Sequence, residues 1–296
     1  MMENLEGVYV ALVTPFTQDG DVNYAGLQEN VDWLIKQGVH GLIPLGSTGE
    51  FASLEDEQKR RVMQTVIQAA RGKVSVIVGA SAETTQKAVF YAKQAEEFGA
   101  DGVLILPPWY YTPNCEEIFN HYARIAESIK IPIMIYNNPI SSKVDVKPEI
   151  VARLAKLPNI TSIKESSGDI RRITLIRILT DERLTIFCGW EDMAYESFIM
   201  GARGWVCVIG NVAPQLAVQL YELTVVQKDY DAAWKLYKRM LPFLRYLEYS
   251  GKTHKALKYL LDKMGLCGGY CSSPKLPLSD VEKAEVEKLF NQLSIT

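Results

Sequence analysis

The sequence predicts an α/β protein: a (β/α)8 barrel, the TIM-barrel architecture, with a C-terminal helical extension. Short apolar runs alternate with amphipathic stretches along the chain, and the apolar runs are continuous rather than alternating with polar residues. Continuous apolar runs are typical of parallel strands that are covered on both faces. Eight such units within roughly 220 residues fit a closed barrel. A doubly wound sheet is less favoured, because no Gly-x-Gly-x-x-Gly follows the first run.

The boundaries of the elements follow from this alternation. Eight strands are expected at residues 8–13, 41–45, 74–78, 102–106, 132–136, 160–164, 185–188 and 204–208. Helices are expected between them at residues 24–37, 54–70, 84–98, 116–129, 147–156, 170–179 and 192–200. Ser53, with Asp56 three residues on, predicts a capping box at the start of the second helix.

The remaining chain is expected to be helical at residues 214–226, 230–249, 254–264 and 279–293. We therefore expect residues 1–212 to form the barrel with the active site. Residues 213–296 are expected to form a helical region that packs on the barrel and does not function separately, because no low-complexity linker divides the two parts.

Composition narrows the class of protein. The chain has 296 residues, of which 48% are hydrophobic and 23% charged, with a net charge of −3. This balance gives no support for a nucleic-acid or membrane partner, and no apolar run approaches the roughly 20 residues of a membrane-spanning helix. The start lacks a basic segment of the secretory type. Five cysteines, two of them in expected strands, indicate buried free thiols and a cytoplasmic location.

Lys164 ends the sixth expected strand, in Ile163-Lys164-Glu165-Ser166-Ser167-Gly168-Asp169. In a barrel, the residues at the carboxyl ends of the strands form the active-site face. Dry surroundings disfavour the ammonium form of a lysine, and a neutral amine is a nucleophile toward a carbonyl. A lysine in such a segment more often extends its charge to water. The residues at the other strand ends favour the chemical role.

The turn Gly46-Ser47-Thr48-Gly49-Glu50 follows the second expected strand. Two glycines around two hydroxyls make a tight turn whose amides and hydroxyls can converge on a carboxylate. The turn lacks the Gly-Lys-Ser/Thr of a nucleotide phosphate loop. Considered alone, it is also compatible with an ordinary βα loop.

Three further strand ends carry informative residues. Tyr136 ends the strand next to that of Lys164, so the phenol can meet the amine and transfer a proton. Pro107 to Pro113 form a stiff loop with Trp109, Tyr110 and Tyr111, which core packing or a subunit contact explains as well as catalysis does. Gly189-Trp190-Glu191-Asp192 and Ile209-Gly210-Asn211 follow the last two strands.

Together, a lysine, a nearby phenol and an anion-binding turn indicate imine chemistry on a 2-oxo acid. The amine condenses with the carbonyl, and the protonated imine stabilises a carbanion-like enamine at the adjacent carbon. This permits C–C cleavage, C–C formation or β-elimination. A metal-dependent aldolase is disfavoured, because the three histidines (His40, His121 and His254) include no pair at ligand spacing. His40 and His254 are expected to be structural or solvated.

These motifs resemble the class I Schiff-base lyases grouped around dihydrodipicolinate synthase and N-acetylneuraminate lyase, over essentially the whole chain. The resemblance implies that Lys164 forms the imine, that Tyr136 transfers protons, and that Gly46, Ser47 and Thr48 provide carboxylate and relay contacts. It implies that Tyr110 reaches into the relay of a neighbouring subunit, and that Gly189, Trp190 and Ile209 line the substrate. It further implies a homotetramer built as a dimer of dimers, and no metal or organic cofactor.

Two features depart from dihydrodipicolinate synthases. Ser141 stands where those enzymes carry an arginine for the carboxylate of the second substrate, which argues against the lysine-biosynthesis reaction; Lys143 offers a nearby cation. Trp190-Glu191-Asp192 resembles the branches that act on hydroxylated 2-oxo acids, although Asp192 is also suited to cap the following helix.

We therefore expect a lyase that acts on pyruvate or a 3-deoxy-2-oxo sugar acid, by aldol cleavage or condensation or by dehydration. Three alternatives stay open: a 4-hydroxy-tetrahydrodipicolinate synthase that joins pyruvate and aspartate semialdehyde, a hydroxypyrroline-carboxylate deaminase, and a barrel that senses 2-oxo acids without turnover. The presence of both Lys164 and Tyr136 argues against the last.

Overall fold

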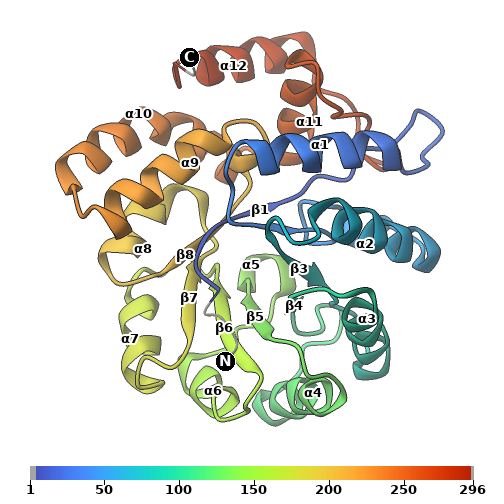
Figure 1. Cartoon of the computed structure of the whole chain (residues 1–296), viewed down its shortest axis with the longest axis vertical. Coiled ribbons are helices and arrows are strands. Elements are labelled where there is room, and N and C mark those ends of the chain that lie inside the picture. The colour runs from blue at the N-terminus through green and yellow to red at the C-terminus, as the bar shows by residue number, and fades with distance from the viewer. Residues whose placement is uncertain (1–4, 295–296) are drawn as a thin grey trace.

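The chain forms a closed barrel of eight parallel strands in sequence order (Figure 1), which confirms the predicted fold class. The computed structural model describes residues 5–294. β8 pairs with β1, with Gly204 opposite Gly7, and this pairing closes the barrel. The strands are β1 (Gly7–Ala11), β2 (Gly41–Ile43), β3 (Ser75–Gly79), β4 (Gly102–Ile105), β5 (Ile133–Asn137), β6 (Ile160–Glu165), β7 (Thr185–Cys188) and β8 (Gly204–Cys207).

Helices surround the strands and cover their outer faces (Figure 1). The helices up to the last strand are α1 (Tyr24–Lys36), α2 (Asp56–Ala70), α3 (Thr85–Phe98), α4 (Cys115–Ser128), α5 (Pro139–Ser142), α6 (Pro148–Leu154), α7 (Arg171–Leu179) and α8 (Ala194–Ile199). Short 3-10 turns occur at η1 (Phe51–Ser53), η2 (Glu191–Met193) and η3 (Ile209–Asn211).

Two aromatic side chains, Tyr9 and Phe187, lie inside the barrel among aliphatic ones, and glycines make room for them. The rings of Tyr9 and Phe187 meet edge to face, with their centres 5.2 Å apart. A Cβ at Gly41 would stand 2.1 Å from the Tyr9 ring, and one at Gly204 would stand 2.2 Å from that of Phe187. Interiors are close-packed, so these two strand positions accept only glycine while the aromatic rings keep their places.

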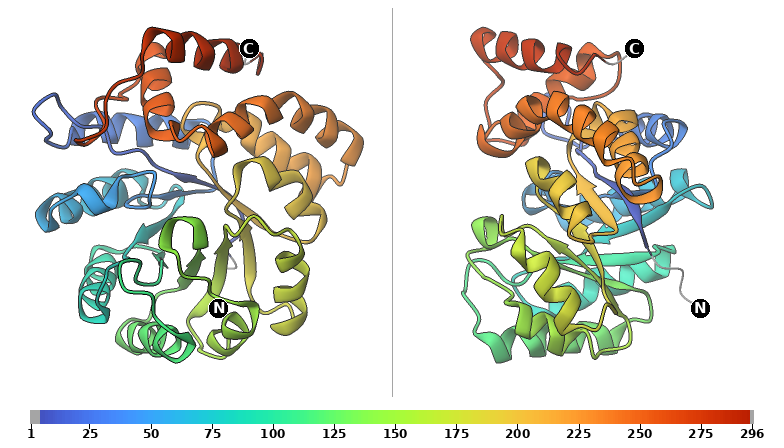
Figure 2. Two further views of the ribbon diagram at one scale, coloured as in Figure 1. Left: turned by 180° about the vertical axis from the view of Figure 1, so that it is seen from behind. Right: turned by 90° about the vertical axis from the view of Figure 1, so that its left-hand side faces the viewer.

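The C-terminal helices are α9 (Pro214–Tyr221), α10 (Tyr230–Tyr249), α11 (Thr253–Lys263) and α12 (Asp280–Asn291), with a π-helical turn, η4 (Glu222–Val226), after α9. Figure 2 shows α10 to α12, in orange to red, gathered at one end of the molecule. α9 packs on β1 and β8, in the place of the eighth barrel helix. We therefore propose that the extension proper begins with α10, later than the predicted division at residue 213.

The structure differs from the prediction at two places. The predicted capping box of Ser53 with Asp56 is wrong: Leu54 is extended and buried, so the helix begins after it, and Glu55 forms the box with Gln58. The short helix α5 was not predicted. It begins with Pro139, and the side chain of Asn138 caps it by accepting a hydrogen bond from the Ser141 amide.

Two of the five cysteines are buried, whereas Cys115 is exposed and Cys267 and Cys271 are half-buried. Cys188 and Cys207 are buried at the ends of β7 and β8, and all five cysteines are free thiols. None of the helices within residues 5–294 is long and apolar enough to cross a membrane.

Candidate active site

Lys164 and Tyr136 lie side by side at the carboxyl ends of β6 and β5. They are register partners in the sheet, and register partners on neighbouring parallel strands point to the same face. The Lys164 Nζ atom stands 4.2 Å from the centre of the Tyr136 ring. The two residues are only 6% and 5% exposed. The structure therefore brings together the amine and the phenol that the sequence singled out.

The Tyr136 hydroxyl lies among donors. Asn138 Nδ2 donates a hydrogen bond to it at 3.0 Å. Burial alone raises the pKa of Tyr136, but the positive charge of Lys164 opposes this, together with hydrogen bonds from Asn138, Ser47 and Lys164. The net result is a lowered pKa. A phenol with a lowered pKa exchanges its proton more readily near neutral pH.

Gly189 leaves the space that the Lys164 side chain occupies. A Cβ at Gly189 would stand 2.7 Å from Lys164 Cγ and 1.9 Å from Ser166 Oγ. Ser166 donates its hydroxyl to the Gly189 carbonyl at 3.0 Å. The end of β7 is thus held close against the lysine, and a larger residue at Gly189 would displace it.

The turn of residues 46–50 is held to the first strand end. Thr14 Oγ1 donates to the Gly49 carbonyl at 2.8 Å, and a Cβ at Gly49 would come within 3.1 Å of the Leu12 carbonyl. Thr48 is buried, and Ser47 contributes a hydrogen bond to Tyr136. Ser47 therefore lies near the phenol, and Gly46 and Thr48 lie beside it in the same turn.

Glu50 ties this turn to the C-terminal region, although its backbone is left-handed (φ 55°). Its side chain is fully buried. Glu50 Oε1 accepts a hydrogen bond from Lys258 Nζ at 2.6 Å, and Oε2 accepts from Lys275 Nζ at 2.8 Å and from Ser272 Oγ at 2.8 Å. Burial alone would raise the pKa of Glu50, but these donors hold it at about 2. The carboxylate therefore stays ionised inside the protein, because both of its oxygens have charged partners.

His254, at the start of α11, contacts the same turn. Its Nε2 atom lies 3.0 Å from the Ser47 carbonyl oxygen, and burial lowers the pKa of the imidazole. A neutral imidazole can donate to this carbonyl and keep the turn in place. The role is structural, as expected for this histidine.

Glu191 is buried between the last two strand ends. Its carboxylate accepts hydrogen bonds from the amides of Val208, at 2.7 Å, and Ile209, at 3.0 Å. Burial raises its pKa to about 8, and the neighbouring Glu248 adds to this, whereas the amides and Lys164 act in the opposite direction. Glu191 therefore fixes the loop after β8, including Ile209, and both of its oxygens are occupied by the protein.

The capping role predicted for Asp192 is wrong. Its carboxylate bonds to Arg245 at 3.0 Å and accepts from the Tyr249 hydroxyl at 3.3 Å, both on α10. Trp190 Nε1 donates to the same hydroxyl at 3.3 Å, and its ring covers Gly168. α10 supplies the partners because it packs against η2. Glu191 and Asp192 therefore hold loops and helices together and are not free toward a substrate.

Ser141 lines a cavity of about 240 Å3 together with Ser47, Trp109 and His254. Lys143 ends α5 in a left-handed conformation and is exposed. Among the described residues that line this cavity, the cation is Lys275, which also bonds to Glu50. Lys143, the cation that the sequence offered near Ser141, is not among the described residues that line this cavity.

Tyr110 is not brought to Lys164 within the chain. Its side chain is 93% exposed, and Tyr111 is 63% exposed. The Tyr110 amide donates to Glu83 Oε1 at 3.1 Å, which anchors the loop while the ring stays outside. A tyrosine exposed to this degree on a stiff loop is available for a second copy of the chain.

Sequence reasoning missed two side chains of this site. Asn138 donates to the phenol, and its position before Pro139 was a detectable helix-capping signal. Lys258 is 1% exposed on the buried face of α11, next to Leu257 and Leu261. A lysine on the apolar face of an amphipathic helix indicates a buried acidic partner. The sequence does not show which aspartate or glutamate of the chain is that partner.

The arrangement can support imine chemistry. A buried amine and a phenol beside it occupy the carboxyl ends of the neighbouring strands β6 and β5, and a turn that presents amides and hydroxyls follows β2 on the same face of the barrel. Within residues 5–294, no group of three or more histidine, cysteine, aspartate or glutamate side chains is placed to hold a metal ion.

The chain is similar in sequence and in structure to known proteins of one family. The sequence model of the dihydrodipicolinate synthetase family matches residues 4–293. Proteins named 4-hydroxy-tetrahydrodipicolinate synthase from Methanosphaerula palustris and Methanothrix thermoacetophila are 35% and 33% identical, over 98% and 97% of both chains. The solved structure of a chloride-inhibited dihydrodipicolinate synthase from Acinetobacter baumannii, complexed with pyruvate, is 29% identical. It superposes with a TM-score of 0.92 over 99% of this chain and 100% of that one.

The raised pKa of Glu191 predicts a pH dependence of stability. Its pKa is about 8 in the folded chain, against a usual 4.5. Between these values the folded state binds more protons, so this group makes the free energy of unfolding fall as pH rises. Replacing it by glutamine (Glu191→Gln) should remove that slope. The variant should therefore gain stability relative to wild type from about pH 5 to about pH 8 in urea unfolding.

The matched control is Glu149→Gln, at an exposed position on α6, whose difference from wild type should stay flat. A Glu191→Gln difference that is equally flat over this range would contradict the assignment of the titration to Glu191.

Proposed function

Because the chain belongs to the dihydrodipicolinate synthetase family, we propose that its lysine-imine lyase chemistry takes place on Lys164, with pyruvate or a related 2-oxo acid. Members of this family are lyases that form a Schiff base with pyruvate and need no metal or organic cofactor. The observation that carries the assignment to Lys164 is its burial beside Tyr136, with Nζ 4.2 Å from the ring centre.

The proposed reaction begins with attack of the Lys164 amine on the carbonyl carbon of the 2-oxo acid. The resulting carbinolamine loses water, and the Tyr136 phenol supplies the proton that the departing hydroxyl needs. The protonated imine then withdraws electrons from the adjacent carbon, which gives up a proton to the Tyr136 phenolate and becomes an enamine nucleophile. The amides and hydroxyls of residues 46–50 hold the carboxylate during these steps.

Two observations bear on the second substrate. The full-length relatives that are named 4-hydroxy-tetrahydrodipicolinate synthase favour aspartate semialdehyde. Ser141, in place of the arginine expected from the resemblance, favours an aldehyde or 2-oxo acid with hydroxyl groups instead of a second carboxylate. Condensation of pyruvate with aspartate semialdehyde and cleavage of 3-deoxy-2-oxo sugar acids, assayed side by side, distinguish the two. The preferred substrate is the one with the higher kcat/KM.

The proposed assembly is a tetramer with two kinds of contact. Tetramers are typical of the family, and the exposed Tyr110 loop offers one interface. A second apolar patch on α7 and α8 offers the other, because monomeric proteins seldom leave such patches uncovered. The patch consists of Leu175, Ile178, Leu179, Ile199 and Met200, each at least 41% exposed.

Borohydride trapping tests the imine. Pyruvate and borohydride should add one reduced adduct to the protein, on the peptide that contains Lys164, as read by mass spectrometry. Lys164→Ala should lose both the adduct and turnover while keeping the circular dichroism spectrum of the fold. Lys156→Ala, at an exposed lysine eight positions before it, is the matched control. An adduct on another lysine, or none from folded protein with any 2-oxo acid, would refute the proposal.

Tyr136→Phe tests the proton transfer. Loss of the phenol should slow turnover by about 10²- to 10⁴-fold, which is typical of a general acid–base group. Tyr122→Phe is the control, because Tyr122 is also buried and its hydroxyl donates to the Ile105 carbonyl. Tyr122→Phe should lower the melting temperature and leave kcat near wild type. An equal effect of both changes on kcat would assign the proton to another group.

Sedimentation velocity combined with an assay tests the assembly. Ile178→Asp should split the tetramer into dimers, because it places a charge in an apolar contact. Tyr110→Ala should cut turnover by at least tenfold even where the assembly persists. Tyr230→Ala, at a 46% exposed tyrosine on α10, should change neither. A fully active monomer at the concentration of the assay would contradict the proposal.

A further inference from the structure

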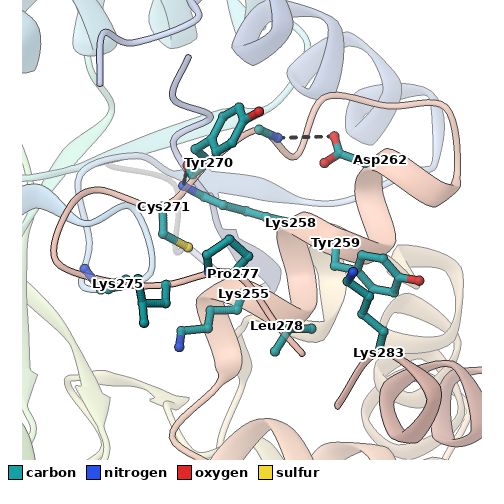
Figure 3. Close-up of a pocket in the computed structure, with 12 residues that line it drawn as sticks. Lys255, Lys258, Tyr259, Asp262, Tyr270, Cys271, Lys275, Pro277, Leu278 and Lys283 are labelled. Carbon is teal, nitrogen blue, oxygen red and sulfur yellow. Dashed lines mark hydrogen bonds between the residues drawn. The ribbon is translucent and has the colours of Figure 1, made fainter. Parts of the chain in front are cut away.

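A second cavity lies among the C-terminal helices, between α11, the loop of residues 264–279 and α12 (Figure 3). Its volume is about 300 Å3, at the lower end for small-molecule sites. Among the described residues that line it, none is predicted to take part in the reaction. The lining residues are Lys255, Lys258, Tyr259, Asp262, Gly269, Tyr270, Cys271, Lys275, Leu276, Pro277, Leu278 and Lys283.

The walls of this cavity are fixed by internal contacts. Asp262 Oδ1 accepts hydrogen bonds from the amides of Gly268, at 2.8 Å, and Gly269, at 3.2 Å; Figure 3 shows Asp262 at the edge of the loop. Lys258 Nζ donates to the Tyr270 carbonyl at 2.6 Å. A Cβ at Gly268 would stand 1.8 Å from the Lys258 carbonyl, so the loop lies directly on α11. A ligand would therefore enter a preformed site and need not order a loop.

The lysine ammonium groups around the cavity outnumber the carboxylates that pair with them. Lys258 and Lys275 share the single carboxylate of Glu50. Lys255 is half-buried and makes no ion pair with any residue that the structure describes. Burial raises the pKa of the Cys271 thiol and the charge of Glu50 adds to that rise, whereas the charges of Lys258, Lys275 and Lys255 oppose it. Ammonium groups that line one cavity repel each other, and a bound anion relieves that repulsion.

Apolar residues line part of the cavity, beside the charged Asp262 and Lys283. The apolar residues are Leu276, Pro277 and Leu278. Figure 3 shows the Tyr259 ring near Lys283. Pockets for small molecules combine such apolar walls with a few polar groups that fix orientation. The complementary ligand is therefore an anionic group, a carboxylate or a phosphate ester, on a small apolar body.

We propose that this cavity is a binding site for a small organic anion, and that Lys275 couples its occupancy to the turn of residues 46–50. Lys275 lines this cavity and also the cavity that contains Ser47 and Ser141, and its ammonium group donates to Glu50. An anion that attracts this ammonium group weakens its bond to Glu50 and loosens the turn. The coupling rests on the proposed role of the turn in holding the substrate carboxylate; the binding does not.

Isothermal titration with phenyl phosphate and benzoate tests the binding. We expect one site per chain for at least one of the two, weaker binding of inorganic phosphate, and no binding of neutral benzyl alcohol. The stronger of the two aromatic anions identifies the charged group. Lys255→Met should weaken binding about tenfold, the effect of one hydrogen bond to a charged group. Lys238→Met, at an exposed lysine on α10, should leave it unchanged. Absence of binding, or equal affinity in Lys255→Met, would overturn the site.

Borohydride trapping of pyruvate in the presence of the anion tests the coupling between the cavity and the turn. At saturating aromatic anion, the pyruvate concentration for half-maximal borohydride trapping should rise several-fold in wild type and stay unchanged in Lys275→Met. An unchanged value in wild type would refute the coupling but leave the site. The anion should also bind Lys164→Ala as tightly as wild type. A protein that binds the anion but forms no pyruvate adduct would refute the proposed function without affecting this site.

Discussion

The carboxylate of Glu50 lies inside the protein between two lysine ammonium groups and a serine hydroxyl. A buried ion is stable only where every lone pair finds a donor, because losing one partner leaves an uncompensated charge. Two of these donors, Lys258 and Lys275, come from more than 200 residues further along the chain. The turn that contains Ser47 and Thr48 therefore depends on the C-terminal region for its shape. Residues beyond the barrel strands are part of the site's support.

A second constraint comes from the register of β5 and β6. Tyr136 and Lys164 are opposite each other, so a shift of one residue in either strand would turn one of the two side chains to the other face. The residues after them, Asn137 and Glu165, are also opposite each other, and Asn137 Nδ2 donates to Glu165 Oε2 at 3.1 Å. This pair on the outer face fixes the register that the inner pair needs.

The acidic residues after β7 show how one stretch can serve packing while resembling a binding motif. In the sequence, Trp190-Glu191-Asp192 resembles branches that act on hydroxylated 2-oxo acids, and Asp192 is also suited to cap a helix. The carboxylates of Glu191 and Asp192 are taken by the amides after β8 and by side chains of α10. Tertiary packing brought these partners close, and buried carboxylates take the nearest donors because an unsatisfied one is costly.

The sequence alone determined the barrel, the order of its strands and the pairing of an amine with a phenol. Continuous apolar runs record burial on both faces, and the strand ends of a parallel barrel meet at one face whatever the loops do. The sequence did not determine which carboxylate pairs with Lys258, why Asn138 matters to the phenol, or that Lys275 reaches two cavities. Those contacts join residues that are distant in the chain or lie at loop tips. Such contacts leave no periodic trace, because they depend on how the loops and the C-terminal helices pack after the barrel has closed.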